Sequence, residues 1–300
     1  MPEPFYIVGP TAVGKTDLAV RAAELCGAEI VNADAFQVYA GLARLTAKPS
    51  AEAMARVRHH LVGHVPLSEV YNVARFQEEA SACLRDLAAR GRQAVVVGGS
   101  GLYVKALTHG LSPLPPAQPE LRAELEAAEL HALVARLEEL DPATAAVIDR
   151  RNKRRVVRAV EICLATGRPV SEQRTAWQDA ERPVRGVFLV RERGDLVARI
   201  RQRTESLLEE PGLEEVREAL LAPVSDTAAG IIGLAEIAAW LAGDTDRAGC
   251  LECIETATRR YAKRQMTWFR REAFQETIPL SAGTDPEALA HALAGKIAAG

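Results

Sequence analysis

The chain has 300 residues, of which 48% are hydrophobic and 26% are charged, and its formal net charge is −3. These values are typical of a globular protein with a sizeable core, and they exclude binding to nucleic acid through overall basicity. A nucleic-acid partner would have to be recognised by a local basic patch.

The N-terminus and the cysteines indicate a cytoplasmic protein. Met1-Pro2-Glu3-Pro4 leads into an apolar segment without a basic region, so we expect no signal peptide. The longest apolar run, residues 228–242, contains Gly233 and Glu236, so we expect no membrane span. Five cysteines show no disulfide framework.

The first third of the chain alternates between apolar strands and helices. Strands are predicted at Phe5–Val8, Glu29–Val31 and Ala94–Val97, and a helix is predicted at Asp17–Cys26. Each strand is followed by turn residues and then a helical pattern. Strands that are apolar throughout are typical of a parallel α/β sheet covered on both faces.

A proline-rich segment marks a boundary after this region. Four prolines lie between Ser112 and Pro119, which excludes a helix there. Only helical patterns follow, at Glu120–Leu140, Pro142–Ile148 and Asn152–Thr166.

A strand returns at Gly186–Val190, and further helices are predicted up to an alanine-rich tail after Pro279. We therefore expect a P-loop α/β core formed by residues 1–112 and 184–300, with C-terminal helices. A helical insertion domain at residues 113–183 would interrupt this core.

The segment after the first strand carries the clearest chemical signal. Gly9-Pro10-Thr11-Ala12-Val13-Gly14-Lys15-Thr16 matches the ATP-binding-type motif G-x-x-x-x-G-K-[ST] in full. Its backbone N–H groups and the following helix N-terminus form an anion site. Lys15 adds a positive charge, and the Thr16 hydroxyl can coordinate Mg²⁺ as a cofactor. The motif predicts a phosphate or diphosphate site, and it does not by itself specify a nucleotide.

Two further turns follow predicted strands. Asp34 lies where ligands bind in open α/β sheets, and it could be an outer-shell Mg²⁺ ligand, a general base or a helix cap without chemistry. Gly98-Gly99-Ser100-Gly101 either lets the backbone approach a ligand closely or makes a tight strand-to-helix turn.

Two basic runs are candidates for nucleic-acid contact. Arg150–Arg158 contains six cations in nine residues, and Arg259–Arg271 interleaves cations with aromatic side chains. The first pattern suits phosphate contact, and the second suits base stacking as well. The alternatives are a solvated helix face for the first run, and packing of Trp268 and Phe269 onto the core for the second.

Two possible metal sites are not favoured. Cys250-x-x-Cys253 lacks a second cysteine pair. His59-His60 with His64 lacks a nearby cysteine or paired carboxylate.

Taken in order, the motifs resemble the tRNA dimethylallyltransferase family, also called tRNA isopentenylpyrophosphate transferases. The resemblance runs from about residue 5 to residue 271. It rests on Gly9–Thr16, Asp34-x-x-Gln37-Val38-Tyr39, Thr46-Ala47-Lys48-Pro49, His59-His60-Leu61, Gly98-Gly99-Ser100-Gly101-Leu102-Tyr103-x-Lys105-Ala106-Leu107 and Lys263-Arg264-Gln265-x-Thr267-Trp268-Phe269-Arg270.

The resemblance implies transfer of a dimethylallyl group from dimethylallyl diphosphate to the exocyclic amine (N6) of the adenosine next to the anticodon in tRNA. The P-loop, Gly9–Thr16, would hold the diphosphate rather than ATP. The catalytic residues would be Asp34, Ser100, Lys15 and Arg203. We expect a monomer that binds the anticodon stem-loop. The implied tRNA contacts are Asp34, Ala35, Phe36, Gln37, Ser100, Arg122, Arg154, Arg155, Val156, Val157, Arg158, Lys263, Arg264, Gln265, Met266, Thr267, Trp268, Phe269 and Arg270.

The chain departs from the family pattern at several positions. Gly233-Leu234-Ala235 stands where the family commonly has Gly-Tyr-Arg, and Ser100 replaces a usual threonine but keeps the hydroxyl. Ala35, Gly63 and Leu45 replace a usual serine, aspartate and glycine. These changes leave the diphosphate site intact and leave the details of tRNA binding open.

Three alternative functions predict different features. A small-molecule P-loop kinase would bind ATP, but it gives no reason for the helical insertion or the basic runs. A non-catalytic tRNA-binding module would not need an intact P-loop with Asp34 and Ser100. An enzyme that prenylates free adenine nucleotides would need neither the insertion nor the Lys263–Arg270 run.

Overall fold

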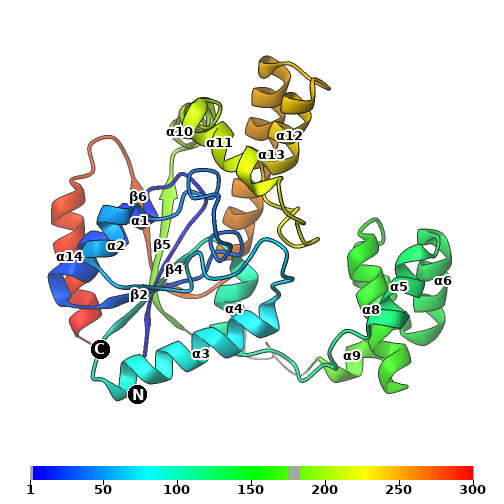
Figure 1. Ribbon diagram of the computed structural model, residues 1–300. Helices are drawn as coiled ribbons and strands as arrows, with labels where there is room; N and C mark the ends of the chain where they lie inside the picture. The colour runs from blue at the N-terminus through cyan, green and yellow to red at the C-terminus, as the bar shows by residue number, and fades with distance from the viewer. Residues whose placement is uncertain (1–2, 175–176, 178–182, 300) are drawn as a thin grey trace. The chain divides into compact units, whose positions relative to one another are not determined.

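The computed structural model describes residues 3–174, 177 and 183–299, and its centre is a parallel sheet (Figure 1). Among the described residues the sheet has six strands in the order β3-β2-β4-β1-β5-β6. The P-loop α/β class expected from the sequence is confirmed. The strands are β1 Phe5–Val8, β2 Glu29–Asn32, β3 His59–His60, β4 Ala94–Gly98, β5 Val184–Arg191 and β6 Phe274–Leu280.

Helices cover both faces of this sheet, which explains why its inner strands are mainly apolar. Adjacent residues of β4 point to opposite faces, so Val96 and Val95 belong to two different hydrophobic cores. The first core includes Phe76 of α3 and Tyr103 of α4, and the second includes residues of α1 and α14. The helices of this unit are α1 Lys15–Cys26, α2 Ala51–Arg56, α3 Val73–Ala89, α4 Gly101–His109, α10 Arg193–Leu207, α11 Glu210–Ala219, α12 Leu234–Ala242, α13 Arg247–Phe269 and α14 Pro286–Ala298.

The sequence patterns missed the strand β6, because only helices were predicted after Gly186–Val190. This strand pairs in parallel with β5 at the edge of the sheet, with Thr277 opposite Phe188. Most of its side chains are exposed, and it contains Pro279, which an edge strand tolerates. It therefore lacks the continuous apolar run that identified the inner strands.

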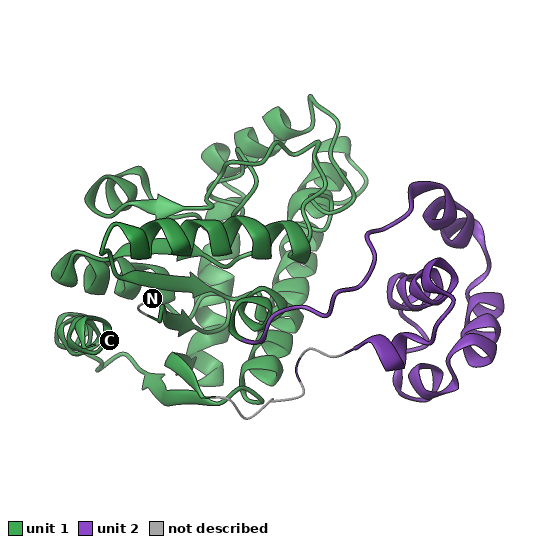
Figure 2. Ribbon diagram, turned by 90° about the horizontal axis from the view of Figure 1, so that it is seen from below, with its two compact units in different colours: residues 1–108, 180–300 green, residues 109–179 purple. Residues whose placement is uncertain are grey.

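A second compact unit comprises residues 109–179 (Figure 2). The insertion was predicted at residues 113–183, so each boundary of the unit lies four residues earlier in the chain than predicted. Part of the predicted C-terminal boundary, residues 175–176 and 178–182, lies outside the described residues, as do residues 1–2 and 300. The helices of this unit are α5 Pro119–Ala127, α6 Leu130–Leu140, α7 Pro142–Val147, α8 Lys153–Thr166 and α9 Val170–Gln173.

The helical unit has its own hydrophobic core, which includes Leu133 and Leu137 of α6 with Val156 and Val160 of α8. In the described parts of the chain, no helix combines the length and apolar character needed to cross a membrane.

Candidate active site

The P-loop turns between β1 and α1 around a buried lysine. Gly14 has a φ of 101°, a left-handed conformation that favours glycine, and it is the residue before the first turn of α1. The Lys15 ammonium donates to the Pro10 carbonyl at 3.3 Å. Burial lowers the pKa of Lys15 to about 8; the Asp34 carboxylate raises it, and Arg203 lowers it further. An anion bound here would stabilise the charged form of Lys15, which burial disfavours.

Three arginines surround the P-loop from one side. Arg203 donates to the Thr11 hydroxyl at 2.9 Å and to the Leu45 carbonyl at 2.8 Å. Arg199, one turn earlier in α10, donates to the Ala12 carbonyl at 2.8 Å. The third arginine is Arg191. Together with Lys15, the three arginines bring four positive charges to the P-loop.

Arg191, at the end of β5, donates to the Val13 carbonyl at 3.3 Å and pairs with Asp195 at 2.5 Å. The sequence identified Arg203 but missed Arg191 and Arg199. The four-residue spacing of Arg199 and Arg203, which places them on one helix face, was the available signal.

Asp34 follows β2, and one of its carboxylate oxygens caps the turn that it begins. Its Oδ1 accepts from the Phe36 backbone N–H at 3.0 Å, and its own N–H donates to Asn32 Oδ1 at 3.2 Å. No described residue donates a hydrogen bond to Oδ2. The turn-capping and chemical interpretations are therefore compatible, because the two oxygens can serve different purposes.

Ser100 holds the Asp34 turn against the start of α4. The Ser100 hydroxyl accepts from the Ala35 N–H at 2.8 Å, and the Ser100 N–H donates to the Ala33 carbonyl at 3.2 Å. A Cβ on Gly98 would lie 2.1 Å from the Ala33 carbonyl oxygen. Of the two interpretations of this glycine-rich segment, the tight turn accounts for Gly98, whose close neighbour is protein backbone.

Tyr261 of α13 is a site residue that the sequence analysis did not select. It lines the pocket beside the P-loop together with Asp34 and Arg203. Burial, followed by the nearby Asp34 carboxylate, raises the pKa of Tyr261. The Phe36 ring lies 6.1 Å from the Tyr261 ring, measured between centroids. The mixed basic and aromatic run was the signal for this residue, but the run did not single it out.

Gln265 connects the P-loop to the turn after β4. Its Oε1 accepts from the Thr11 N–H at 2.8 Å, and its Nε2 donates to the Gly99 carbonyl at 2.9 Å. The side chain is 4% exposed. The expectation that its side chain contacts tRNA is therefore corrected: both ends are occupied inside the protein.

A pocket lined by both polar and apolar side chains lies beside the P-loop. Its cavity volume is about 50 Å³. Thr11, Asp34, Arg203 and Tyr261 line it together with Ala12, Thr46, Thr204 and Thr258. Its apolar lining consists of Phe36, Leu45, Ile200, Leu207, Ile231, Ile232 and Ile254.

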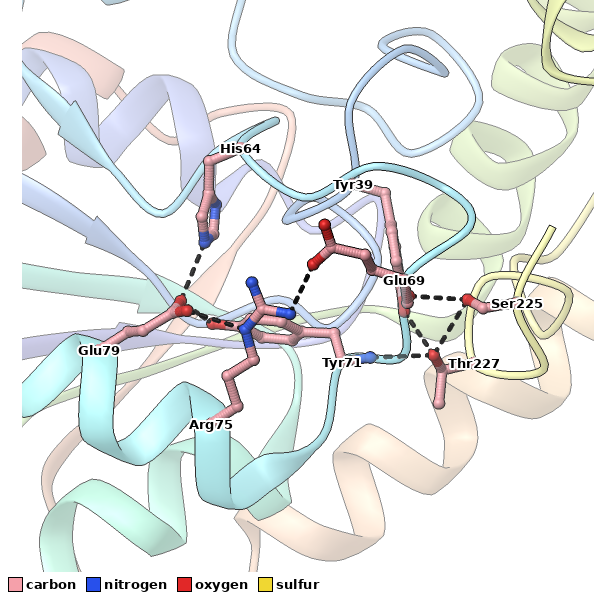
Figure 3. A network of polar contacts seen from close by, with 8 residues as sticks. All are labelled: Tyr39, His64, Glu69, Tyr71, Arg75, Glu79, Ser225 and Thr227. Atoms are coloured by element: carbon pink, nitrogen blue, oxygen red, sulfur yellow. Dashed lines mark hydrogen bonds and ion pairs between the residues drawn. The ribbon is translucent and has the colours of Figure 1, made fainter. Parts of the chain in front are cut away.

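A polar network holds the loop that supplies Ile231 and Ile232 to this pocket (Figure 3). The Thr227 hydroxyl lies 2.6 Å from the Tyr39 hydroxyl and accepts from the Tyr71 N–H at 3.1 Å. Ser225 donates to the Glu69 carbonyl at 2.8 Å. The loop before α12 is thereby fixed to the loop before α3.

The first basic run lies on α8 and has two kinds of residue. Arg154 and Arg155 are exposed, whereas Val156 and Val157 are buried in the core of the helical unit. The expected tRNA contacts through the side chains of these two valines are therefore wrong. Their apolar side chains stabilise the unit that presents the arginines.

Arg122 and Arg158 share one buried carboxylate. Arg158 pairs with Glu161 at 2.6 Å, and Arg122 pairs with the same carboxylate. Arg158 also donates to the Pro115 carbonyl at 2.5 Å. Glu161 is fully buried, so its charge needs these partners. Both arginines thus have a structural role within this unit.

The second basic run lies on α13. Lys263, Arg264, Thr267 and Arg270 are exposed, and Met266 and Trp268 are partly buried. Phe269 is 1% exposed, and its ring centroid lies 5.8 Å from that of Phe188. Of the two interpretations, core packing holds for Phe269, and its expected side-chain contact with tRNA is wrong. Trp268 packs against Gly101.

Comparison with known proteins identifies the family. A family model described as IPP transferase matches residues 37–272. The chain belongs to the IPP transferase family. The resemblance inferred from the sequence motifs is confirmed.

This IPP transferase is 42% identical to a tRNA dimethylallyltransferase of Akkermansia muciniphila, over 95% of the chain and 96% of that protein. It is also similar to the solved tRNA isopentenylpyrophosphate transferase of Bacillus halodurans, with 33% identity and a TM-score of 0.70, over 99% and 97% of the two chains. A eukaryotic dimethylallyltransferase solved acting on tRNA gives a TM-score of 0.74 at 26% identity, over 90% of this chain and 70% of that one.

The Gly233-Leu234-Ala235 departure lies at the start of α12 in this IPP transferase. Gly233 has a φ of 99° at the start of α12, and its N–H donates to Glu236 at 2.9 Å. Leu234 is buried, and Ala235 is exposed. Leu45, at another departure, packs against Gly233 and lines the pocket.

The donor atoms at the P-loop fit Mg²⁺. The Thr16 hydroxyl and the Asp34 carboxylate offer hard oxygen atoms, which Mg²⁺ prefers together with substrate phosphate and water. No group of three His, Cys, Asp or Glu side chains suited to a metal occurs in the described ranges. His59, His60 and His64 instead have separate partners, the Val57 carbonyl, Glu29 and Glu79.

Proposed function

We propose that this IPP transferase transfers a dimethylallyl group from dimethylallyl diphosphate to N6 of the adenosine next to the anticodon in tRNA. Relatives that match nearly the whole chain are named tRNA dimethylallyltransferases. The observation that carries the donor assignment is the pocket beside the P-loop, whose lining combines Thr11, Asp34 and Arg203 with a large set of aliphatic side chains. A nucleoside triphosphate gives no reason for an aliphatic wall of this extent.

The donor diphosphate would bind to the P-loop N–H groups, Lys15 and Arg203, with Arg199 and Arg191 behind the loop. As the allylic C–O bond breaks, negative charge grows on the departing diphosphate. Positive charges fixed in advance stabilise that charge more than they stabilise the intact donor. Mg²⁺ held by Thr16 and the phosphates would neutralise part of the same charge.

The dimethylallyl group would lie against Ile231, Ile232, Phe36 and Leu45. These apolar side chains exclude water, which would otherwise convert the allylic cation to an alcohol. The network around Thr227 keeps this wall in place.

The adenine amine would approach from the Asp34 side. The base must leave the stack of its loop to reach the pocket. As the new N–C bond forms, the amine becomes acidic, and Asp34 Oδ2 would accept its proton. Such proton transfer typically contributes a factor of about 10²–10⁴. Ser100 holds the turn that carries this carboxylate, and Tyr261 lines the same pocket.

The tRNA would be bound through exposed cations of both units. These are Arg154 and Arg155 on α8, Lys263 and Arg264 on α13, and Arg270 at the C-cap of α13. We expect the protein to act as a monomer. We propose that the reaction takes place in the cytoplasm, which a tRNA substrate supports.

One experiment separates this function from a P-loop kinase. The purified protein is incubated with unmodified tRNA and either labelled dimethylallyl diphosphate or labelled ATP, with and without Mg²⁺. We expect label from the prenyl donor in RNA, and competition by inorganic diphosphate. Tight Mg²⁺-dependent ATP binding that diphosphate does not displace, with no label in RNA, would refute the proposal.

A further inference from the structure

One buried histidine nitrogen next to the P-loop has an unused lone pair. His59 Nδ1 lies 2.7 Å from the Val57 carbonyl oxygen, which can only accept, so Nδ1 carries the ring proton. In the neutral ring, Nε2 is therefore an acceptor. This buried atom has no hydrogen-bond partner among the described residues. Burial lowers the pKa of His59, which favours the neutral ring.

A small cavity lies between His59 and the P-loop. Its volume is about 10 Å³, close to the space needed by one water molecule. Thr16, Asn32, Gln37 and His59 provide its polar lining. The remaining lining residues are apolar: Ile30, Pro49, Val62 and Val97.

Only one side-chain donor on this lining is left for His59 within the described part of the chain. Asn32 Nδ2 donates its two hydrogens to the Asp34 and Leu61 carbonyls. Gln37 Nε2 donates its two hydrogens to the Thr46 and Ala47 carbonyls. The Thr16 hydroxyl is the donor that remains.

We propose that His59 is a positioning residue of the diphosphate site, whose Nε2 accepts a hydrogen bond from one water in this cavity, and this water in turn accepts the hydrogen of the Thr16 hydroxyl. This orientation turns the Thr16 lone pairs away from His59, toward the place where a cation and the phosphates would bind. A coordinating hydroxyl keeps its hydrogen, and an acceptor behind it fixes its direction. The inference rests on the proposed function, because it assumes a diphosphate at the P-loop.

The test compares two variants of His59 with a matched control. His59→Leu removes the acceptor and keeps an apolar volume, whereas His59→Gln keeps an acceptor near the position of Nε2. His291→Leu is the control, because His291 Nδ1 also pairs with a backbone carbonyl, at 3.0 Å, but on the exposed face of α14. Calorimetry measures the binding of inorganic diphosphate with and without Mg²⁺, and thermal unfolding is followed in parallel.

We expect His59→Leu to weaken Mg²⁺-dependent diphosphate binding about tenfold, as loss of an outer partner of a metal ligand does. Binding without Mg²⁺ should match the wild type, and His59→Gln should recover most of the affinity. The unfolding temperature of His59→Leu should fall modestly, because the Val57 carbonyl loses its Nδ1–H donor. Wild-type Mg²⁺-dependent binding in His59→Leu would overturn the inference. An equal loss with and without Mg²⁺, together with a lower unfolding temperature, would also overturn it, because it would show a merely structural role.

The proposed function is tested separately by prenyl transfer in the wild type. If wild-type protein fails to label tRNA, the proposed function fails. The assignment of His59 to a diphosphate site still holds in that case if His59→Leu loses Mg²⁺-dependent diphosphate affinity.

Discussion

Replacing Gln265 by leucine tests the role that the structure gives this residue. Gln265 joins the Thr11 N–H of the P-loop to the Gly99 carbonyl after β4. Leucine has a similar size but makes neither hydrogen bond. In the variant, the Thr11 N–H has no acceptor and the Gly99 carbonyl has no donor in a buried site.

The expected loss of stability follows from these two groups. A buried polar group left unsatisfied costs about 1–3 kcal/mol, so the two together predict a loss of about 2–6 kcal/mol in the free energy of unfolding. A water molecule that entered the gap would bring the loss to the lower end of this range. The P-loop would also be less well fixed at Thr11, which predicts weaker diphosphate binding.

Urea unfolding gives the loss as a lower midpoint with an unchanged m-value. Calorimetry with inorganic diphosphate and a separate tRNA-binding assay complete the measurement. Gln275→Leu, at an exposed position on β6, is the matched control and should change none of these values by much. Unchanged stability and diphosphate affinity in Gln265→Leu, with tRNA affinity reduced, would refute the reasoning and return Gln265 to direct tRNA contact.

Three further predictions concern Asp34, Lys15 and α8. Asp34→Asn should lower the single-turnover transfer rate by about 10²–10⁴ with little change in tRNA affinity; retention of much of the rate would show that Asp34 only orients the amine. Diphosphate affinity should fall as the pH rises through about 8, because Lys15 then loses the proton that the bound anion favours. Calorimetry should show that this pH dependence is lost in Lys15→Met. Burial also lowers the pKa of Lys48 to about 8, so a pH dependence that persists in Lys15→Met would assign it to Lys48 instead of Lys15. Replacing Arg154 and Arg155 by alanine should reduce the salt slope of tRNA binding by about two units. Arg158→Ala should mainly reduce stability. An unchanged salt slope in the double variant would show that this face of α8 is solvated and does not contact tRNA.

The sequence predicted the parts of the fold that depend on local signals. The inner strands are apolar because both faces are covered, and the P-loop pattern is continuous in the sequence. The edge strand β6 was missed because its pairing with β5 compensates for an exposed, polar sequence. Such compensation comes from a partner distant in the chain, which no local pattern contains.

The candidate site shows the same division. Lys15, Asp34, Ser100 and Arg203 belong to motifs, and the structure places each of them beside the P-loop pocket or the turn that borders it. The role of Gln265 could not be predicted, because a glutamine within a basic run suggests contact with RNA until its burial is known. The sequence of a basic run shows which residue types it contains. Which of their side chains are exposed depends on how the run is positioned around the helix and on what that helix packs against.

The central claim is transfer to one nucleoside, and the most direct measurement locates the label in the product. A tRNA substrate and a variant with guanosine in place of the adenosine next to the anticodon are each incubated with enzyme, Mg²⁺ and labelled dimethylallyl diphosphate. The RNA is then digested to nucleosides, which are separated and identified by mass spectrometry. The account predicts label on N6 of adenosine from the first tRNA and none from the second. Equal labelling of both tRNAs, or label on a different nucleoside, would contradict it.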